Sequence, residues 1–332
     1  MTRPNLPNRK DKSMSPYDVL ALVIGVFFLI FAAKYLVEGL IGVSARLAVP
    51  PFILAMLIIS IDLEEFAPAV ISSYQNLTAL SYGSILGTVV FLILLALGSA
   101  AALFPIKHPD FPIKYIWLLG GAILLVLLIS LDGVVSRTDG IITLAAYLAF
   151  LVYLIRDLRR TRAARKEIEE AEAEVEKIVR EPPWLFPMML VGGLIGLVIG
   201  ALLVIKGTKA VLHWSGIEET VLGLTLLAIA ANSVELVEAI IPARQGHPEV
   251  VIGNVAGSSF FQLLFTLGIC ALIRPMQVSQ VAIQYFIPAT ALSWLILLIL
   301  VWHRQTPRWI GVGLMGLYAV FVVGSVLLGL GI

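Results

Sequence analysis

Charge is what this sequence lacks most. Only 14% of its 332 residues are Asp, Glu, Lys or Arg, whereas soluble domains average about 25%. Hydrophobic residues make up 59% of the chain. The composition therefore predicts an all-α polytopic membrane protein, with the lipid bilayer as its surroundings. The net charge of +1 gives no electrostatic reason to expect a nucleic-acid partner.

Cysteine and catalytic groupings are also scarce. The single cysteine, Cys270, lies in an apolar run, so no intrachain disulfide is available. We interpret it as a small buried hydrophobe. The four histidines fall in loops or near the ends of apolar segments, and no zinc or nucleophile arrangement is visible. We therefore expect a protein that is not an enzyme and that needs no cofactor.

Long apolar runs, in contrast, are abundant. A spanning helix needs about 20 mostly apolar residues, and ten segments qualify: 17–41, 51–73, 81–104, 114–131, 139–156, 185–208, 219–241, 250–273, 281–302 and 309–331. The first run exceeds a signal-peptide core of about 7–15 residues, so we expect a transmembrane helix there. Short loops and no recognisable transit peptide favour a prokaryotic plasma membrane.

A charged segment, 157–184, divides the chain into halves at 1–156 and 185–332. It is rich in helix formers, which predicts a solvated linker. Ten spans place both termini on one side, whose loops and tails carry seven Lys and Arg residues against fourteen on the other side. The positive-inside rule then predicts a cytoplasmic linker and both termini outside. The sequence does not indicate an oligomeric state.

The two halves contain a repeat. Residues 56–105 align with 226–275 without gaps. The informative matches are Glu65 with Glu235, Gln75 with Gln245, Gly83 with Gly253, Gly87 with Gly257, Gly98 with Gly268 and Pro105 with Pro275. Because each half has five predicted helices, the second half must enter the membrane from the opposite side. The sequence therefore predicts two inverted five-helix repeats, an arrangement typical of secondary transporters, with a shared site near the midplane.

Acidic residues lie within the best-matched part of this repeat. The segment IISIDLEEFAPAV holds Asp62 and Glu65, and AIAANSVELVEAI holds Asn232 and Glu235. A spacing of three places each pair on one helix face. An ionisable group at the bilayer centre costs about 2.5–3.5 kcal/mol, so these groups should face protein, water or a cation. Carboxylate and amide oxygens are ligands that Ca²⁺ prefers.

The depth of these acids follows from helix geometry. In an unbroken helix Glu65 would lie about 21 Å from the start of its segment. Glu64 is turned away from Glu65, and Glu238 has Pro68 as its repeat counterpart. The sequence does not decide whether Glu64 and Glu238 belong to the site.

Two glycine-rich segments, YGSILGTVVF and IGNVAGSSFF, complete the predicted site. Their glycines, spaced four apart, let helices approach closely; they are Gly83, Gly87, Gly253 and Gly257. Ser84 and Asn254 occupy equivalent places and offer oxygens. We interpret Asn254 as functional because an unpaired amide is costly to bury, whereas Ser84 fits packing equally well. Thr88 and Ser258 are interpreted as packing residues.

These residues resemble the cation/calcium antiporters, which include the sodium/calcium exchangers. The family pattern is roughly G-T-S-x-P-E followed by G-N-x-x-G-S-N. Here the first motif reads SIDLEE (60–65) and AANSVE (230–235), and the second reads GSILGTV (83–89) and GNVAGSS (253–259). The resemblance implies that Glu65 and Glu235 bind Ca²⁺.

The sequence departs from that pattern at the threonine–serine pairs, which in sodium-coupled members help to bind Na⁺. Ile61–Asp62 and Ala231–Asn232 replace them. Asn232 and Glu235 also resemble the G-N-A-x-E motif of proton-coupled calcium exchangers. We therefore expect a secondary-active antiporter that exchanges Ca²⁺, or a similar divalent cation, for Na⁺ or H⁺ by alternating access. Two alternatives stay open: a monovalent cation/proton antiporter and a passive cation channel.

Overall fold

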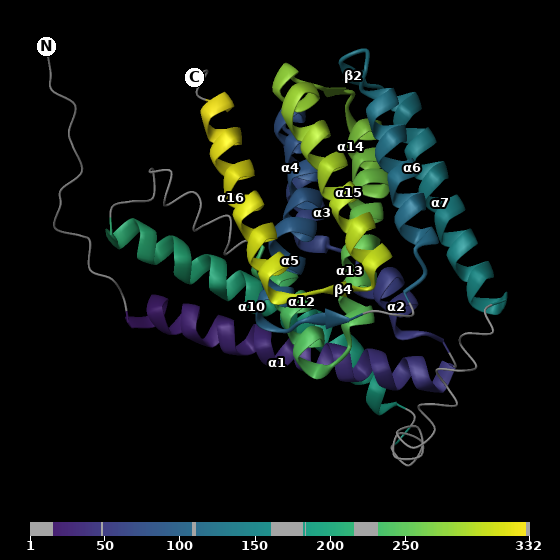
Figure 1. Cartoon of the computed structure of the whole chain (residues 1–332). Coiled ribbons are helices and arrows are strands. Elements are labelled where there is room, and N and C mark those ends of the chain that lie inside the picture. Colours follow the sequence, from purple (N-terminus) through teal and green to yellow (C-terminus); the bar gives the residue numbers. More distant parts are fainter. Residues whose placement is uncertain are drawn as a thin grey trace, which may run out of the picture.

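The computed structural model describes residues 16–47, 49–107, 111–160, 182, 184–215 and 232–329, most of them in helices (Figure 1). The first half contains α1 (Pro16–Leu47), α2 (Pro51–Leu54), η2 (Ala55–Ile59), α3 (Leu63–Tyr74), α4 (Thr78–Phe91), η3 (Leu92–Ala96), α5 (Leu97–Leu103), β1 (Ile106–Lys107), α6 (Lys114–Ile129), β2 (Val134–Val135) and α7 (Arg137–Arg160). The second half contains α10 (Leu185–Ser215), α12 (Ser233–Gln245), α13 (Pro248–Phe260), η4 (Phe261–Thr266), α14 (Leu267–Ile273), β3 (Met276–Gln277), η5 (Ala282–Phe286), α15 (Ile287–His303), β4 (Gln305–Thr306) and α16 (Arg308–Gly329). The η segments are π-helical turns.

Seven helices in the described part of the chain are long and apolar enough to cross a membrane: Leu20–Leu47, Thr78–Leu103, Arg137–Asp157, Leu185–Thr208, Pro248–Ile273, Ala282–His303 and Arg308–Leu328. The predicted span 114–131 is α6, an apolar helix of 16 residues. The predicted span 51–73 is broken between η2 and α3, and most of 219–241 lies outside the described residues. The first residues of the predicted linker continue α7 to Arg160, and 161–181 lie outside the described residues.

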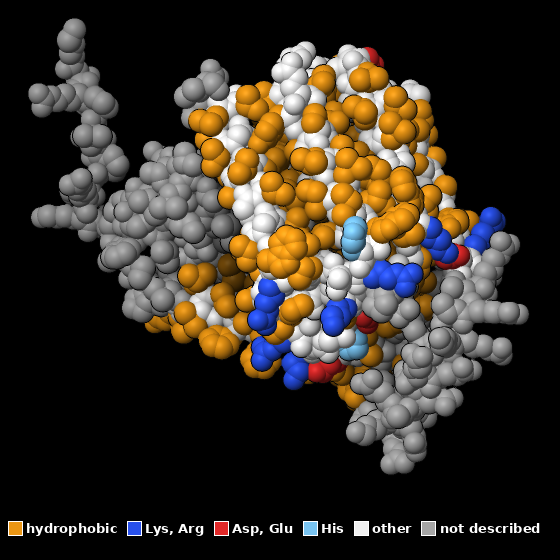
Figure 2. Space-filling view, in the orientation of Figure 1, with side chains coloured by type: hydrophobic (Ala, Val, Ile, Leu, Met, Phe, Trp, Pro, Cys, Tyr) orange, Lys and Arg blue, Asp and Glu red, His pale blue; other side chains and the backbone are white. Residues whose placement is uncertain are grey.

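Apolar side chains cover the outer helices, as expected for a surface in contact with lipid. Phe27 on α1 is 60% exposed and Trp309 on α16 is 74% exposed. In Figure 2 hydrophobic side chains spread over the upper part of the visible face, whereas Lys and Arg gather toward its lower end. Lys107, Arg304 and Arg308 lie in or beside the β1–β4 ribbon at that end. The chain is an integral, multi-pass membrane protein.

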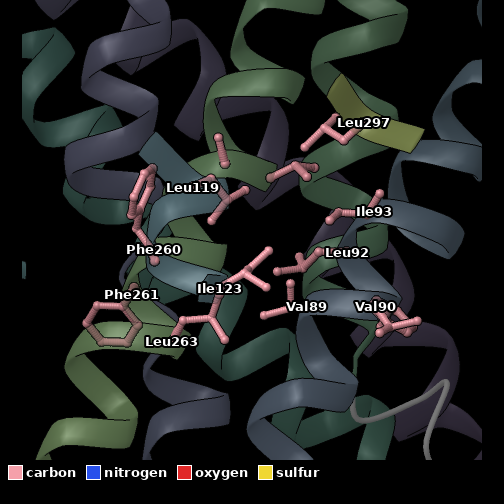
Figure 3. Close-up of a cluster of buried hydrophobic side chains, with 14 of the residues drawn as sticks. Val89, Val90, Leu92, Ile93, Leu119, Ile123, Phe260, Phe261, Leu263 and Leu297 are labelled. Atoms are coloured by element: carbon pink, nitrogen blue, oxygen red, sulfur yellow. The ribbon is translucent and has the colours of Figure 1, made fainter. Parts of the chain in front are cut away.

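The interior is built around two central spans. In Thr78–Leu103 and Pro248–Ile273, 78% of the most apolar 18-residue stretch is buried. The same stretch in the other apolar spans of the described residues is 17–39% buried. Figure 3 shows their side chains meeting those of α6 and α15; the labelled residues are Val89, Val90, Leu92, Ile93, Leu119, Ile123, Phe260, Phe261, Leu263 and Leu297. Phe260 also stacks on Phe150 of α7, with 3.8 Å between ring centroids. Each half thus supplies one helix to the centre.

The order of elements repeats along the chain. Counterparts begin 170 residues apart, as α3 and α12, α4 and α13, α5 and α14, and β1 and β3 do. The strands pair between halves: β1 is antiparallel to β4, and β2 is antiparallel to β3. The two ribbons lie at opposite ends of the bundle, with β2 at the top and β4 near the bottom of Figure 1. Equivalent segments of the two halves therefore occur at opposite ends.

Helices α1 and α10 lie side by side and run across the other helices (Figure 1). Glycines make this contact close. A Cβ atom added to Gly39 would lie 2.5 Å from the Leu190 backbone nitrogen, and one added to Gly193 would lie 2.7 Å from the Leu36 nitrogen. In a bilayer, such small residues let helices gain van der Waals contact over a long interface.

This close approach predicts that Gly193→Val destabilises the protein, whereas Gly192→Val does not. The new side chain at 193 would meet the backbone of α1, and a Cβ at 192 meets no described atom within 4 Å. Overpacking of this kind costs about 1–3 kcal/mol. Thermal unfolding of the detergent-solubilised protein should show a lower midpoint for Gly193→Val only. Equal midpoints for the two variants would contradict the packing described here.

Candidate cation site

The first predicted acidic segment is not one continuous helix. η2 ends at Ile59, and α3 begins only at Leu63, with Asp62 in a non-helical conformation (φ −76°, ψ 78°). The Ser60 hydroxyl donates to the Met56 carbonyl one turn back, a bond that often bends helices. The depth calculated for Glu65 in an unbroken helix therefore does not apply to this segment. The break occurs without the proline of the family pattern.

Both repeat-related glutamates lie at helix starts. Glu65 is the third residue of α3, and Glu235 is the third residue of α12, which follows Asn232. The first backbone N–H groups of a helix lack intrahelical partners, and the helix dipole is positive there. A carboxylate is therefore better tolerated in this first turn than in the middle of a spanning helix.

A chain of hydrogen bonds joins the two halves at this break. The Ser258 hydroxyl of α13 donates to Asp62 Oδ1 at 3.0 Å. One turn earlier, Asn254 Nδ2 donates to Glu238 Oε2 at 3.0 Å. The side chains are buried: Asp62 is 4% exposed, Glu238 is 5% exposed and Asn254 is 2% exposed. Ser258 therefore contacts the acid of the other half, although we had interpreted it as a packing residue.

The other predicted ligands are placed less uniformly. Glu235 is 1% exposed. Glu65 is half-buried and accepts a hydrogen bond from the Thr88 hydroxyl at 3.3 Å. Asn232 is half-buried, and Ser84 lies exposed on α4. The structure thus gathers Asp62, Asn254 and Glu238 through hydrogen bonds and leaves Ser84 outside that group.

The glycines of the second repeat explain how α13 reaches the break. A Cβ added to Gly253 would lie 2.6 Å from the Phe52 carbonyl oxygen, and one added to Gly257 would lie 2.7 Å from the Met56 Cα. Bare backbone on α13 therefore lets α2 and η2 pack directly against it. Within the described residues, a Cβ at Gly83 meets nothing and one at Gly87 meets only Phe286, at 3.9 Å.

One polar residue near this site was missed in the sequence. Gln262 lies one turn after Ser258, is 1% exposed, and has no hydrogen-bond partner for either amide atom within the described part of the chain. Its counterpart in the repeat is Leu92. That exchange of a polar for an apolar residue, inside the best-matched part of the repeat, was the available signal. A buried amide of this kind is available to water or to a bound cation.

The acids do not form a compact all-acid centre. Among the described residues, no three His, Cys, Asp or Glu side chains come close enough together to hold a metal ion. A cation here would therefore combine carboxylates with neutral oxygens from hydroxyl, amide or backbone carbonyl groups. Flexible oxygen shells of this mixed type suit Ca²⁺, and carbonyl-rich helix breaks in transporters coordinate Na⁺.

Comparison with known proteins places the chain in a family. The sequence model for "Sodium/calcium exchanger protein" matches residues 17–156 and 185–327. The chain belongs to this family. A curated relative, Inner membrane protein YrbG of Escherichia coli, is 28% identical over 91% of this chain and 94% of its own. Sodium/calcium exchanger MaX1 of Methanosarcina acetivorans is 24% identical over 93% of this chain and 99% of its own.

A solved structure supports the fold. The sodium-calcium exchanger NCX_Mj, soaked with zero Na⁺ and Ca²⁺, superposes with a TM-score of 0.79 at 22% identity and covers 92% of this chain and 98% of its own. The sequence-based resemblance to the cation/calcium antiporters is therefore confirmed. MaX1 and NCX_Mj are both named as sodium/calcium exchangers.

The hydrogen bond across the halves generates a testable prediction. Ser258→Ala removes the donor to the buried Asp62 carboxylate and should cost about 1.5–3 kcal/mol, the value for bonds to charged groups. Ser259→Ala is the matched control, because that hydroxyl is equally buried but only donates to the Val255 carbonyl. Thermal unfolding in detergent measures both. A Ser259→Ala variant as destabilised as Ser258→Ala would show that Asp62 gains little from its donor.

Proposed function

We propose that this protein is a secondary-active antiporter that exchanges Ca²⁺, or a similar divalent cation, for Na⁺ or H⁺ by alternating access. The observation that carries the proposal is the buried contact of Asp62 with Ser258. It joins a broken segment of one half, which also carries Glu65, to a central helix of the other half. A membrane protein has little reason to bury this many acids unless they face a polar cargo.

The proposed topology is ten membrane-crossing segments in two inverted five-helix repeats. Support comes from the repeated order of elements and from the two strand ribbons, which lie at opposite ends of the bundle. The broken segment ending in α3 and its counterpart ending in α12 count as one crossing each. This topology makes the two halves equivalent from opposite sides of the membrane, which alternating access requires.

The proposed mechanism is competition for shared oxygens. Glu65 and Glu235 bind the cation, with Asp62, Asn232, Asn254 and Gln262 adding oxygens. Ca²⁺ entering from one side displaces the coupling ion, because both require the same carboxylates. The two halves then rearrange so that the site opens to the other side. Ser84 is not part of this set, because it lies exposed on α4.

A flux experiment tests this function. Purified protein in sealed liposomes should accumulate external Ca²⁺ when an outward Na⁺ or H⁺ gradient is imposed. Glu65→Gln and Glu235→Gln should each reduce that uptake at least about tenfold, because loss of an interaction worth roughly 1.4 kcal/mol already gives that factor. Glu249→Gln is the control, since Glu249 pairs with His247 at the start of α13, away from the break.

The same experiment separates the alternatives. Uptake with an H⁺ gradient alone assigns proton coupling, and uptake with a Na⁺ gradient alone assigns sodium coupling. Exchange of monovalent cations without Ca²⁺ uptake would identify the monovalent cation/proton antiporter. Ca²⁺ entry that needs no counter-ion would identify a passive channel, and full uptake by both Gln variants would refute the proposed role of the glutamates.

We also propose that the β1–β4 end of the bundle and residues 157–184 face the cytoplasm, with both termini outside. Lys107, Arg304 and Arg308 at that end support this orientation through the positive-inside rule.

Lys107→Cys should then react with a membrane-impermeant maleimide only after lysis of intact cells. Asp132→Cys, in the turn before β2 at the other end, should react without lysis. The native Cys270 is buried, so its background labelling should be low. The reverse labelling pattern would show that the protein has the opposite orientation in the membrane.

A further inference from the structure

We infer that Glu238 is a positioning residue: it orients the Asn254 amide so that the amide oxygen faces the cation site. The inference rests on the proposed cation binding and assigns a role to an acid that the repeat leaves without a counterpart. Glu238 lies three residues after Glu235 on α12, so the two share a helix face. Sequence alone left its role open.

The geometry fixes which way the amide points. An asparagine side chain presents a donor group and an acceptor atom, and exchange of the two is a simple rotation. An ionised carboxylate only accepts hydrogen bonds. Because Asn254 Nδ2 lies 3.0 Å from Glu238 Oε2, the NH₂ group must face Glu238. The carbonyl oxygen Oδ1 then faces the opposite way, toward Ser258 at 3.5 Å.

The amide oxygen of Asn254 is available to a cation, because the single hydroxyl proton of Ser258 goes to another acceptor. Ser258 has one hydroxyl proton and two acceptors within reach, Asp62 Oδ1 at 3.0 Å and Asn254 Oδ1 at 3.5 Å. The shorter bond, to a charged oxygen, is the stronger one. Asn254 Oδ1 therefore keeps lone pairs free for a cation, next to the Asp62 carboxylate. Hard cations are bound by such converging oxygens.

A cavity beside Glu238 makes this arrangement less costly. It has a volume of about 210 Å³ and is lined by Asp62 and Glu238 together with apolar side chains such as Ile59, Leu194 and Leu197. It has room for several waters, which the two carboxylates in its wall can hold by hydrogen bonds. Water there would lower the cost of burying the Glu238 carboxylate, which accepts the hydrogen bond from the Asn254 amide.

The arrangement is confined to one half of the molecule. The repeat counterpart of Glu238 is Pro68, and that of Asn254 is Ser84, which lies exposed. Only the second half therefore has an amide at this position, and only the second half has a carboxylate to orient it. The two residues form one functional unit, in the way that outer groups orient metal ligands in other proteins.

A charge-swap cycle tests the inference. Asn254→Asp alone places a carboxylate at position 254 next to the Glu238 carboxylate, and the two repel each other. This change should weaken cation binding about 10–100-fold, the usual cost of losing an orienting group. Glu238→Gln alone keeps an acceptor oxygen and should change binding by less than about tenfold. In the double variant the new amide at position 238 donates to the new carboxylate at position 254, so the bond is restored with its direction reversed. We expect the double variant to bind better than Asn254→Asp alone.

The readout is the half-saturating Ca²⁺ concentration, taken both from liposome exchange and from the cation-induced rise in unfolding temperature. A double variant whose loss equals the product of the two single losses would overturn the inference, because independent residues behave additively. Glu238→Gln as weak as Asn254→Asp would also overturn it, since Glu238 would then act through its own charge. Wild-type protein that binds Ca²⁺ without exchanging it would refute the proposed transport while the thermal data still decide the role of Glu238.

Discussion

The cost of burying charge in an apolar bundle is the constraint on which the rest of this structure depends. Asp62, Glu235 and Glu238 are each at most 5% exposed, in a chain whose outer surface is covered with apolar side chains. Three devices lower that cost here: helix starts that offer free N–H groups, hydrogen bonds from Ser258 and Asn254, and a cavity beside the acids. Without these three features the buried acids would destabilise the folded protein. The site and the fold therefore depend on the same interactions.

Breaking the helix at Asp62 has consequences for packing. A broken helix exposes backbone groups that lipid cannot satisfy, so the break must be enclosed by protein. α13 provides that enclosure, and its glycines at 253 and 257 allow contact with the backbone of α2 and η2. Bulkier hydrophobes of α13 and η4, such as Phe260 and Leu263, lie in the cluster formed with α6 and α15 (Figure 3). The small-residue motif and the broken helix therefore depend on each other.

Much of this could be predicted from the sequence, because membrane spans and internal repeats are encoded locally. Hydropathy located the apolar spans, and a gap-free alignment of the two halves matched Glu65 with Glu235. The break at Ser60–Asp62 was not predictable in the same way, since the usual proline is absent and a serine-to-backbone bond replaces it. Equivalence in sequence does not guarantee equivalent exposure, since Ser84 lies exposed whereas its counterpart Asn254 is buried. Gln262 was missed because its counterpart is Leu92.

The positions at which the two halves differ are where cation selectivity should arise. A duplicated scaffold supplies the same helix start twice, but Asp62 faces a donor from the other half while its counterpart is the neutral Asn232. Glu238 and Gln262 likewise have apolar or proline counterparts. Two equivalent glutamates supply negative charge but do not select one cation over another, because many cations bind two carboxylates. We propose that the residues without an equivalent in the other half fix the number and direction of the remaining oxygens, and that these oxygens distinguish one cation from another.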